Sequence, residues 1–589
     1  MQTSPFRLEN VGQKTNMIPA RKFAREATPE STINRRLSDL REVAANLTKS
    51  KLGPLRTCEA VIKGKTLDLK TGAFFAGLPP EEKHYWISSL YALLMPRNRR
   101  RKLAAYFTPP HLATHAVNIL LCAGIRPGTD RILDPSSGGA AFLVPLASHI
   151  ARQAKNRRLP AESVLERIEN SLFGVEIEPG LAALSKILIA DLLKEEIRSA
   201  KRKPKTSVQE TNTLNLKAPE EHYDAIIGNP PYGRILKPTK KLLEEFALVI
   251  SDGYVNLYTL FLEQAIRFVK PGGVICLIVP MSFIGGPYFA NLRKRILETC
   301  DVICLDPIDK RSDVFLDVLY DVCVLALRKK GGSGPAIVPT CSLLMVDQPN
   351  RNLGNLELPR RLNSAVWALP DAEQACSVFQ SGFETLRDYG YVARTGYFVW
   401  NREKKRYRIG RKPRSNEVPL FWAHNVKPGV PCRPYDRNPA GEKIGFVKIG
   451  WETNAIIRED ALILQRTSNR RQDRRLRAAV ARQSQIPGGR GFVGENHTII
   501  IVPDPKKKTK VKLSVLCRLL NTSAVDSRFR RISGSVSVST KALNQLPLPA
   551  ADQVRRRFVA DCDDELTAQL CYIESLKLTK ASSARDSED

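Results

Sequence analysis

The chain has 589 residues, of which 43% are hydrophobic, so it is long enough for two or three domains and too apolar for a disordered protein. Its formal net charge of +32 lies far from the near-neutral balance of most soluble enzymes and indicates a polyanionic partner. The first residues lack the apolar run of a signal peptide, and no stretch approaches the ~20 apolar residues of a membrane-spanning helix. We therefore expect a cytoplasmic protein that binds nucleic acid and no membrane.

The first third of the chain changes character near residue 100. Residues 1–100 read as helical and poor in strand patterns, and we interpret them as a helical, basic accessory segment. Residues 101–330 alternate short apolar runs with amphipathic helical stretches, in the order RILDP, SLFGVEIEP, YDAIIGNPP and GGVICLIVP. This alternation predicts βαβ units, and therefore an α/β domain with a parallel sheet and helices on both faces.

Three motifs in this domain place polar residues where a nucleotide-type ligand binds such a sheet. FTPP puts Thr108 at the start of a helix, a position that suits a ligand carboxylate. RILDPSSGG ends a strand in Asp134 and continues in a turn of small residues, where Gly138 allows the backbone to approach a ligand closely. LFGVEIEP ends the next strand in Glu176, whose carboxylate can accept hydrogen bonds from ribose hydroxyls.

The sharpest signal is DAIIGNPPYGR, in which a buried-strand pattern ends directly in Asn-Pro-Pro-Tyr. The two prolines fix φ and lack N–H donors, so the turn is rigid. The Asn229 side-chain oxygen and the Pro230 carbonyl can each accept a hydrogen bond from an exocyclic amino group. Tyr232 offers a flat face on which a base can stack, an interaction worth ~1–3 kcal/mol, which is comparable to the cost of flipping a base. The turn therefore predicts a site for an extruded base.

Beyond the α/β domain, the sequence predicts three further parts. KKGGSGP marks a domain boundary, and residues 331–365 are expected to form a linker. Residues 366–550 contain strand-like pieces punctuated by Gly, Pro and Asn, which predicts a mixed, β-rich domain. Residues 551–589 are predicted to form a helix, DDELTAQLCYIESLKL, followed by a disordered tail, SSARDSED.

Positive charge is concentrated in the C-terminal half. Residues 401–540 carry 31 Lys and Arg against 11 Asp and Glu. The basic residues are interleaved with polar ones in QRTSNRRQDRRLR and DSRFRRISGS, a pattern typical of segments that contact phosphates while a few side chains read bases. We expect the β-rich domain to supply most of the DNA-binding surface.

Cysteine and histidine spacing gives no support for a metal site. The twelve cysteines are scattered, and none forms a C-x-x-C pair. Cys300 and Cys304 flank a strand-like run, and His111 and His115 stand four apart without the Glu of H-E-x-x-H. We therefore expect no metal cofactor.

Taken in this order, FTPP, DPSSGG, GVEIEP and NPPY resemble the gamma class of amino-group DNA methyltransferases, the TaqI-like enzymes and modification subunits of restriction-modification systems. The resemblance covers about residues 102–327. It implies a Rossmann-like, S-adenosylmethionine-dependent catalytic domain followed by a target recognition domain, and transfer of a methyl group to N6 of an adenine flipped out of duplex DNA. It also implies a prokaryotic protein, with a separate restriction endonuclease as a possible partner and an oligomeric state that the sequence leaves open.

The resemblance assigns roles residue by residue. Thr108 would contact the methionine end of the cofactor, Glu176 the ribose and Ile177 the adenine ring. The cofactor residues that it implies are Thr108, Asp134, Ser137, Gly138, Glu176, Ile177 and Asn212. The residues that it implies for the target base are Asn229, Pro230 and Tyr232, together with Phe289 in the segment VPMSFIGGPYFANLRKRIL, which would stack edgewise on the base.

Two positions depart from the family pattern. Ala140 stands where the family usually has another glycine, so the cofactor loop is expected to be tighter. Asn212 stands where the family tends to have an Asp that binds the amino group of the cofactor's adenine, although an amide oxygen can accept the same hydrogen bond. These changes bear on cofactor affinity rather than on the reaction.

Three other classes of enzyme share part of this pattern: cytosine-N4 DNA methyltransferases, methyltransferases of protein glutamine or RNA guanine, and bifunctional restriction enzymes. Cytosine N4 methylation uses the same kind of turn, and so do protein-glutamine and RNA guanine methyltransferases, which generally lack a large basic domain after the catalytic one. A bifunctional restriction enzyme would need a nuclease in residues 1–100, where CEAVIKGK near Glu59 is the nearest approach to a carboxylate motif. Adenine N6 methylation of DNA is favoured over all three.

Overall fold

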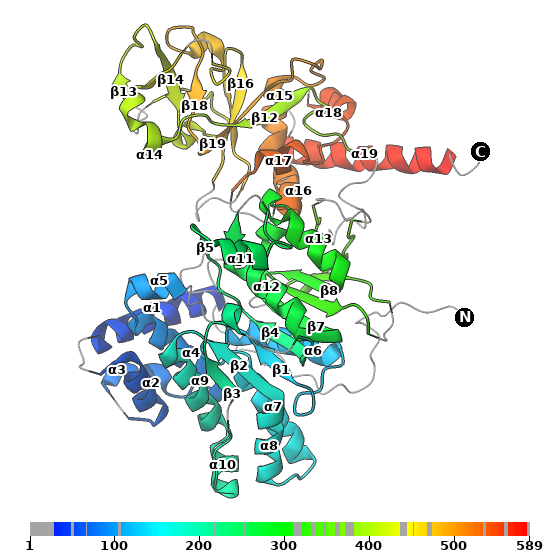
Figure 1. The fold of residues 1–589 in the computed structure, drawn as a ribbon. Helices are drawn as coiled ribbons and strands as arrows, with labels where there is room; N and C mark the ends of the chain where they lie inside the picture. The colour runs from blue at the N-terminus through cyan, green and yellow to red at the C-terminus, as the bar shows by residue number, and fades with distance from the viewer. Residues whose placement is uncertain are drawn as a thin grey trace. The chain divides into compact units, whose positions relative to one another are not determined.

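The computed structural model divides the chain into two compact units, Met1–Phe283 with Tyr288–Ala365, and Ile284–Pro287 with Val366–Asp589. Each unit is described by itself (Figure 1). The residues that the structure describes are 29–48, 52–65, 67–103, 108–205, 207–216, 220–251, 254–309, 321–332, 336–345, 349–359, 366–370, 382–435, 444–450, 453–467, 474–533, 537–558 and 563–585.

The first unit begins with helices. They are α1 (Pro29–Leu47), α2 (Pro54–Ile62), α3 (Leu69–Phe75), α4 (Pro80–Leu94) and α5 (Arg97–Leu103). Pro80 occupies the first turn of α4, where its missing N–H is not needed, and Glu81 and Glu82 complement the positive end of the helix. CEAVIKGK starts on α2 rather than on a strand, which removes the nearest candidate for a nuclease motif.

A sheet of nine strands forms the centre of the described part of this unit, in the order β11-β10-β8-β9-β7-β4-β1-β2-β3. Strands β1 to β4 and β7 pair in parallel, and β9 runs antiparallel between β7 and β8. The strands are β1 (Ile132–Asp134), β2 (Leu172–Glu176), β3 (Ser207–Glu210), β4 (Tyr223–Gly228), β7 (Val269–Pro280), β8 (Cys300–Pro307), β9 (Val322–Lys329), β10 (Thr340–Leu343) and β11 (Arg351–Asn355). The Rossmann-like α/β fold expected from the sequence is thereby confirmed.

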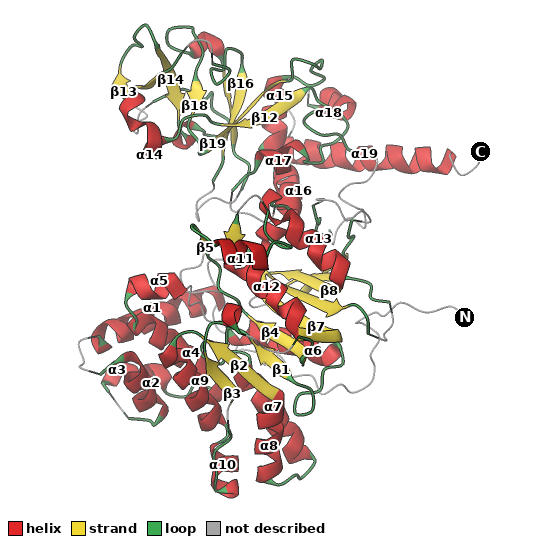
Figure 2. Ribbon diagram, viewed as in Figure 1, coloured by secondary structure: helices red, strands yellow, loops and turns green. Residues whose placement is uncertain are grey.

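Helices cover this sheet, with α12 and α13 on one face and α6 on the other (Figure 2). The strands between them are almost fully buried, because a sheet covered on both faces must be apolar on both. A short ribbon of β5 (Arg234–Ile235) and β6 (Val255–Asn256) lies outside the main sheet. The helices are α6 (Pro110–Cys122), α7 (Leu143–Asn156), α8 (Ala161–Ser171), α9 (Pro179–Leu192), α10 (Lys194–Ala200), α11 (Lys240–Glu245), α12 (Leu257–Phe268) and α13 (Ala290–Thr299).

The structure differs from the prediction that residues 331–365 form a linker. Strand β10 pairs in parallel with β8 at Thr340 and Cys304, and β11 pairs antiparallel with β10. Cys341 is fully buried in this edge. The segment therefore widens the sheet, because the open edge of β8 offers backbone hydrogen bonds that a short strand can complete even without a strong hydrophobic pattern.

The second unit is mixed and β-rich, as the sequence predicted. Its strands form two four-stranded sheets. The first contains β12 (Tyr391–Thr395), β19 (Thr498–Pro503), β16 (Ala461–Gln465) and β17 (Ala478–Ala481), and the second contains β13 (Tyr407–Gly410), β15 (Ile444–Lys448), β14 (Glu417–Phe421) and β18 (Val493–Gly494). The helices are α14 (Trp400–Glu403), α15 (Leu513–Leu520), α16 (Ser523–Ser533), α17 (Thr540–Asn544), α18 (Ala551–Arg557) and α19 (Asp564–Arg585).

The end of the chain is more ordered than expected. Helix α19 continues to Arg585, so the first half of the predicted disordered tail is helical, and residues 586–589 lie outside the described residues. Cys571 and Tyr572 of α19 are fully buried in the core of the second unit. Residues 551–589 thus pack as part of this unit. Within the described residues, no helix combines the length and hydropathy needed to cross a bilayer.

Several arginines of the second unit, predicted to contact phosphates, instead face the protein. Arg474 pairs with Glu565 at 2.6 Å, and Arg475 is 4% exposed. Arg528 lies 3.5 Å from the centre of the Tyr572 ring. The prediction is wrong for Arg475 and Arg528, because a long arginine stem can be buried while its guanidinium finds partners inside the fold. The Arg474 side chain is still 42% exposed. Residues 468–473 of the same run lie outside the described residues.

Other basic residues of the second unit are exposed, and ten of them fall in two stretches. One surrounds α14 and β13, and the other follows β19. These exposed residues are Arg402, Lys404, Lys405, Arg411, Lys412, Arg414, Lys506, Lys507, Lys508 and Lys510.

Candidate functional site

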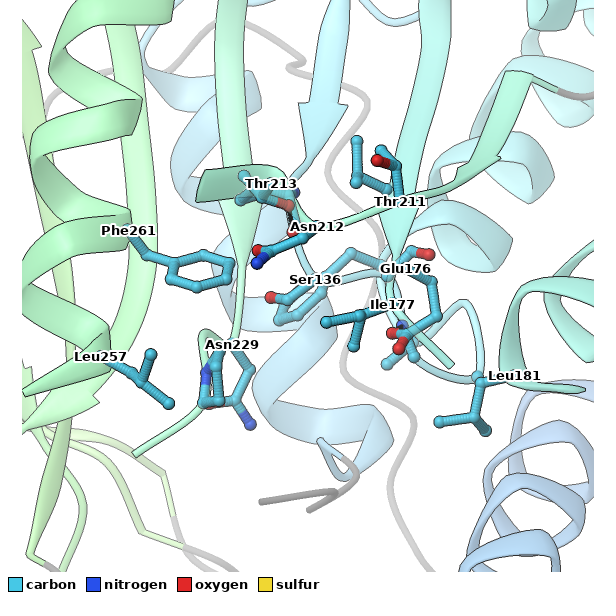
Figure 3. Close-up of a pocket in the computed structure, with 18 of the residues that line it drawn as sticks. Ser136, Glu176, Ile177, Leu181, Thr211, Asn212, Thr213, Asn229, Leu257 and Phe261 are labelled. Atoms are coloured by element: carbon cyan, nitrogen blue, oxygen red, sulfur yellow. Dashed lines mark hydrogen bonds between the residues drawn. The ribbon is translucent and has the colours of Figure 1, made fainter. Parts of the chain in front are cut away.

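A pocket opens in the first unit at the carboxyl ends of β1, β2 and β4, where parallel strands bring their following turns together. Its volume of about 190 Å³ is more than ten times the ~10–15 Å³ that one water needs, so it has room for an organic ligand. Glu176, Ile177 and Leu181 lie across the pocket from Leu257 and Phe261 (Figure 3). The pocket therefore combines one acidic group with several apolar surfaces.

The turn after β1 forms the base of this pocket. Gly138 has φ of +50° and Ala140 has φ of +59°, so the expected tightness at Ala140 is met by a left-handed backbone. The hydroxyl oxygens of Ser136 and Ser137 are buried and have no hydrogen-bond partner within the described part of the chain. Unpaired buried polar atoms beside a cavity are costly unless a ligand or water completes them. The turn therefore offers two hydroxyls to a polar ligand.

Asp134 lies beneath the turn rather than on the pocket wall. Its side chain is fully buried, Oδ1 accepts a hydrogen bond from the Ser136 N–H at 3.0 Å, and Oδ2 has no partner within the described residues. Burial raises the pKa of Asp134 to about 8, and the nearby Glu176 carboxylate adds to the effect. The carboxyl thus shapes the turn from below.

Glu176 closes β2 and is held by backbone donors. Its Oε2 accepts from the Gly138 N–H at 2.8 Å and its Oε1 from the Glu178 N–H at 2.9 Å. Burial raises the pKa of Glu176, and these backbone bonds oppose that rise. The next residue, Ile177, is 54% exposed although it is large and apolar, and it lines the pocket. A carboxylate next to an open apolar side chain suits a ribose attached to a base.

The N-terminal helices support this loop, a contribution that sequence reasoning missed. The Tyr91 hydroxyl on α4 donates to Glu178 Oε2 at 2.8 Å, and Arg99 pairs with Glu178 Oε1 at the same distance. Ser88 of α4 donates to the Gly139 carbonyl at 3.2 Å. These contacts join α4 and α5 to the turns after β1 and β2. Sequence spacing holds no signal for such pairings, because the partners are 51 to 87 residues apart.

The remaining pocket lining includes Asn212 and two residues for which the sequence predicted no role, Leu257 and Phe261. Asn212 lines the pocket while its Oδ1 accepts from the Leu214 N–H at 3.1 Å, which leaves a second lone pair for a ligand. Leu257 and Phe261 line the opposite wall and lie one helical turn apart on α12. Their i, i+4 spacing on a helix that follows the Asn-Pro-Pro-Tyr turn is the sequence signal that could have identified them.

The Asn-Pro-Pro-Tyr turn follows β4 and brings Asn229 onto the wall of the same pocket. The Asn229 amide nitrogen donates to the Thr108 hydroxyl at 3.1 Å. This bond directs the amide oxygen to the other side, where it accepts from the Tyr232 hydroxyl. Thr108 and Asn229, 121 residues apart, thus form one polar bridge between the cofactor-type pocket and the turn.

Tyr232 does not present an open stacking face in this structure. Its side chain is 5% exposed, and its hydroxyl lies within hydrogen-bond distance of both Asn229 Oδ1 and the Ile278 carbonyl. Burial raises the pKa of Tyr232 well above its ordinary value, so the hydroxyl stays a proton donor. Within the turn, the Tyr232 hydroxyl therefore already donates a hydrogen bond to the Asn229 oxygen.

Phe289 also lies apart from the pocket lining. It is 5% exposed and packs edgewise on Tyr254, with ring centres 5.8 Å apart, and at a tilt of 40° on Tyr258, with ring centres 5.6 Å apart. Of the residues assigned from the sequence, the pocket lining gathers Thr108, Ser137, Gly138, Glu176, Ile177, Asn212 and Asn229. The positions outside this lining are Asp134, Pro230, Tyr232 and Phe289.

Comparison with known proteins places this site in a family context. Residues 166–315 match the Eco57I restriction-modification methylase family. The type II methyltransferase M.BsuBI of Bacillus subtilis is 22% identical over 477 residues, which cover 77% of this chain and 89% of that protein. The type II methyltransferase M.PstI of Providencia stuartii is 24% identical over 345 residues, which cover 56% of this chain and 66% of that protein.

A solved structure extends the likeness to the fold of the whole chain. The type IIL restriction-modification enzyme MmeI, solved in complex with DNA, aligns with a TM-score of 0.51 over 94% of this chain and 92% of that one, at 12% identity. The matched segment 166–315 contains Glu176, the Asn229 turn and α12, all of which contribute residues to the pocket lining. The resemblance to restriction-modification methylases found in the sequence is confirmed, because residues 166–315 match that family and most of the chain is similar to a type II methyltransferase.

Proposed function

We propose that the chain is an S-adenosylmethionine-dependent DNA methyltransferase that methylates N6 of an adenine extruded from duplex DNA, as the modification component of a restriction-modification system. The observation that carries the proposal is that Asn229 lies on the wall of the same pocket as Glu176 and Ile177. One cavity therefore offers a nucleoside-type site and an amine acceptor side by side.

The residues of the pocket fit S-adenosylmethionine. Glu176 would accept from the ribose hydroxyls, and the exposed Ile177 side chain would pack on the adenine ring with Phe261 opposite. The unpaired hydroxyls of Ser136 and Ser137 would bind polar groups of the ligand. When bound, the cofactor supplies an electrophilic methyl group. The proposed reaction uses no metal.

The turn would hold the target amine by two acceptors. Asn229 Oδ1 and the Pro230 carbonyl would each accept from the exocyclic amino group, which directs the nitrogen lone pair away from its ring. Thr108 fixes the Asn229 amide so that its oxygen, not its nitrogen, faces the base. For the base to stack on Tyr232, the buried ring must turn toward it, which draws its hydroxyl away from the Asn229 oxygen. Catalysis then rests on positioning.

DNA as the substrate is supported by charge and by the relatives. The net charge is +32, and the exposed lysines and arginines of the second unit offer phosphate contacts. The similar proteins are named as type II methyltransferases, and the structural neighbour was solved with DNA. A restriction endonuclease that cuts the unmethylated site is the partner that this function implies.

The proposal is tested by incubating the chain with methyl-labelled S-adenosylmethionine and, separately, duplex DNA, RNA and ribosomal protein, followed by nucleoside analysis by mass spectrometry. We expect N6-methyladenine in DNA. N4-methylcytosine without N6-methyladenine would assign the second candidate base, and label in RNA or protein alone would contradict the proposal.

A further inference from the structure

An aromatic and basic surface lies beside the catalytic turn, and nothing in the proposed reaction uses it. It is built on the ribbon of β5 and β6, which pairs Arg234 with Asn256. The Leu257 N–H donates to the Gly233 carbonyl at 2.8 Å, so the ribbon is tied to the start of α12 and to the pocket wall. The surface therefore sits within a few residues of Asn229 in the chain and next to α12 in space.

Three side chains on this surface form a stack. The Arg234 guanidinium carbon lies 4.6 Å from the centre of the Tyr254 ring. Tyr254 stacks on Tyr288 with ring centres 4.6 Å apart and an angle of 18° between the rings. Tyr254 thus contacts both the Arg234 guanidinium and the Tyr288 ring. Phe289 braces Tyr254 from its edge.

The stack ends in an open aromatic ring. Tyr288 is 46% exposed, whereas its neighbour Phe289 is 5% exposed. An aromatic ring packed on one face and exposed overall is unusual for a purely structural residue, because burying the second face would gain apolar contacts. The arrangement leaves a flat surface on which a further planar group can stack.

The surroundings of the stack are positively charged. The stretch GRILKPTKK, residues 233–241, contains four basic residues and no acidic one. Arg234, Lys237 and Lys241 are exposed. A flat π surface beside clustered cations fits a nucleobase with its phosphates, since stacking tolerates any base and the cations bind the backbone. A protein segment without acidic residues could stack on the ring but would leave the clustered cations without an anionic partner.

We propose that Tyr288 and Arg234 form a stacking platform for an unpaired nucleobase and its neighbouring phosphate, next to the target adenine. The inference rests on the proposed function in assuming a nucleic-acid substrate. It adds a second base-binding position that stabilises the opened helix, whereas Asn229 holds the base that reacts. A base that loses its stacking partner when the adenine is extruded is the expected occupant.

The platform is tested with a labelled single-stranded oligodeoxythymidylate and the full chain. Thymine has no exocyclic amine, so binding is measured without any possible methylation. Base-aromatic stacking of ~1–3 kcal/mol corresponds to about 5- to 150-fold in affinity. We expect Tyr288→Ala to weaken binding at least fivefold and Tyr288→Phe to bind within twofold of the unmodified chain. Equal binding by Tyr288→Ala and the unmodified chain would overturn the proposal.

The charge contribution has its own matched pair of variants. Arg234→Ala should flatten the dependence of binding on salt, because each lost phosphate contact reduces that slope. Arg157→Ala removes an equally exposed arginine at the end of α7 and should leave the slope unchanged. Equal slopes for the two variants would remove Arg234 from the platform.

A crosslinking measurement separates the platform from DNA binding by the second unit. The same oligonucleotide carrying 5-iododeoxyuridine forms photoadducts with stacked aromatic side chains, and peptide mass spectrometry locates them. An adduct at Tyr288 supports the platform, and adducts confined to residues 366–589 contradict it. A chain that binds at Tyr288 but methylates no DNA would refute the proposed activity and leave the platform standing, so the two failures are distinguishable.

Discussion

The cofactor-type pocket and the Asn-Pro-Pro-Tyr turn lie side by side but are prepared differently for their ligands. In the pocket, buried hydroxyls of Ser136 and Ser137 have no partner among the described residues, and Ile177 is exposed. In the turn, the Asn229 oxygen already accepts a hydrogen bond from the Tyr232 hydroxyl, and the Tyr232 side chain is only 5% exposed. The comparison teaches that the cofactor enters a site that is already formed, whereas the target base must displace a side chain.

The largest expected effect is a loss of methyl transfer without a loss of cofactor affinity, which distinguishes the Asn-Pro-Pro-Tyr turn from the cofactor-type pocket. Asn229→Ala removes an acceptor for the reacting amine, and the loss of one positioned hydrogen-bonding group at a reaction centre typically costs about 10²- to 10³-fold in turnover. We expect methyl transfer to fall by that factor while cofactor affinity stays within twofold, measured by label transfer and by calorimetry. Turnover close to that of the unmodified chain would contradict the role of the turn.

The reciprocal change acts on the pocket. Glu176→Ala removes a carboxylate that would accept from the ribose, and hydrogen bonds to a charged group contribute about 1.5–3 kcal/mol. Cofactor affinity should fall about 10- to 100-fold, whereas DNA affinity, measured by fluorescence anisotropy, should be unchanged. Equal losses of both affinities, together with a lowered melting temperature, would indicate damage to the fold instead.

The buried carboxyl beneath the pocket predicts a pH dependence of stability. The pKa of Asp134 rises on folding to about 8, so the folded chain binds this proton more tightly than the unfolded chain. The contribution of Asp134 to the free energy of unfolding should therefore fall as pH rises from about 4 to 8. Asp134→Asn should remove this loss, so thermal unfolding at pH 8 should favour the variant. A difference between the two proteins that is constant with pH would contradict it.

The conservative change in the turn tests whether Tyr232 must move. Tyr232→Phe keeps a ring for stacking and removes the hydroxyl bond to Asn229, a bond that contributes about 0.5–1.5 kcal/mol. Because the base no longer competes with that hydroxyl, we expect the KM for DNA to fall about two- to tenfold at nearly unchanged kcat. A loss of turnover as deep as that of Asn229→Ala would show that the hydroxyl itself takes part in the reaction.

The smallest expected effect lies in the N-terminal helices. Tyr91→Phe removes the hydrogen bond to Glu178, and Tyr91 acts on the cofactor only through that loop. We expect the KM for the cofactor to rise about two- to fivefold with unchanged kcat. A change in melting temperature with no change in KM would make Tyr91 a structural residue.

The sequence predicted the elements whose patterns are local. The alternation of apolar strands and helices gave the parallel sheet, and the strand-ending residues Glu176 and Asn229 were found because parallel strands bring their carboxyl ends together. Their convergence on one pocket follows from topology rather than from side-chain detail. This part of the site could be predicted without any structure.

What could not be predicted depends on contacts between distant segments. The bond from Tyr91 to Glu178 joins residues 87 apart, and the strand β10 was mistaken for linker because its pairing with β8 supplies stability that its short pattern does not show. The burial of Arg475 and Arg528 could not be predicted either, because an arginine that contacts phosphate and one that fills a core look alike in sequence. Composition shows which part of the chain is basic, but not whether its basic side chains face solvent or the protein interior.

A crystal structure of the chain with S-adenosylhomocysteine and without DNA tests the central comparison most directly. We predict the ribose on Glu176, the adenine between Ile177 and Phe261, and the contact between Tyr232 and Asn229 unchanged. A ligand bound elsewhere, or a pocket filled by the protein's own side chains, would contradict the assignment of this cavity and the function built on it.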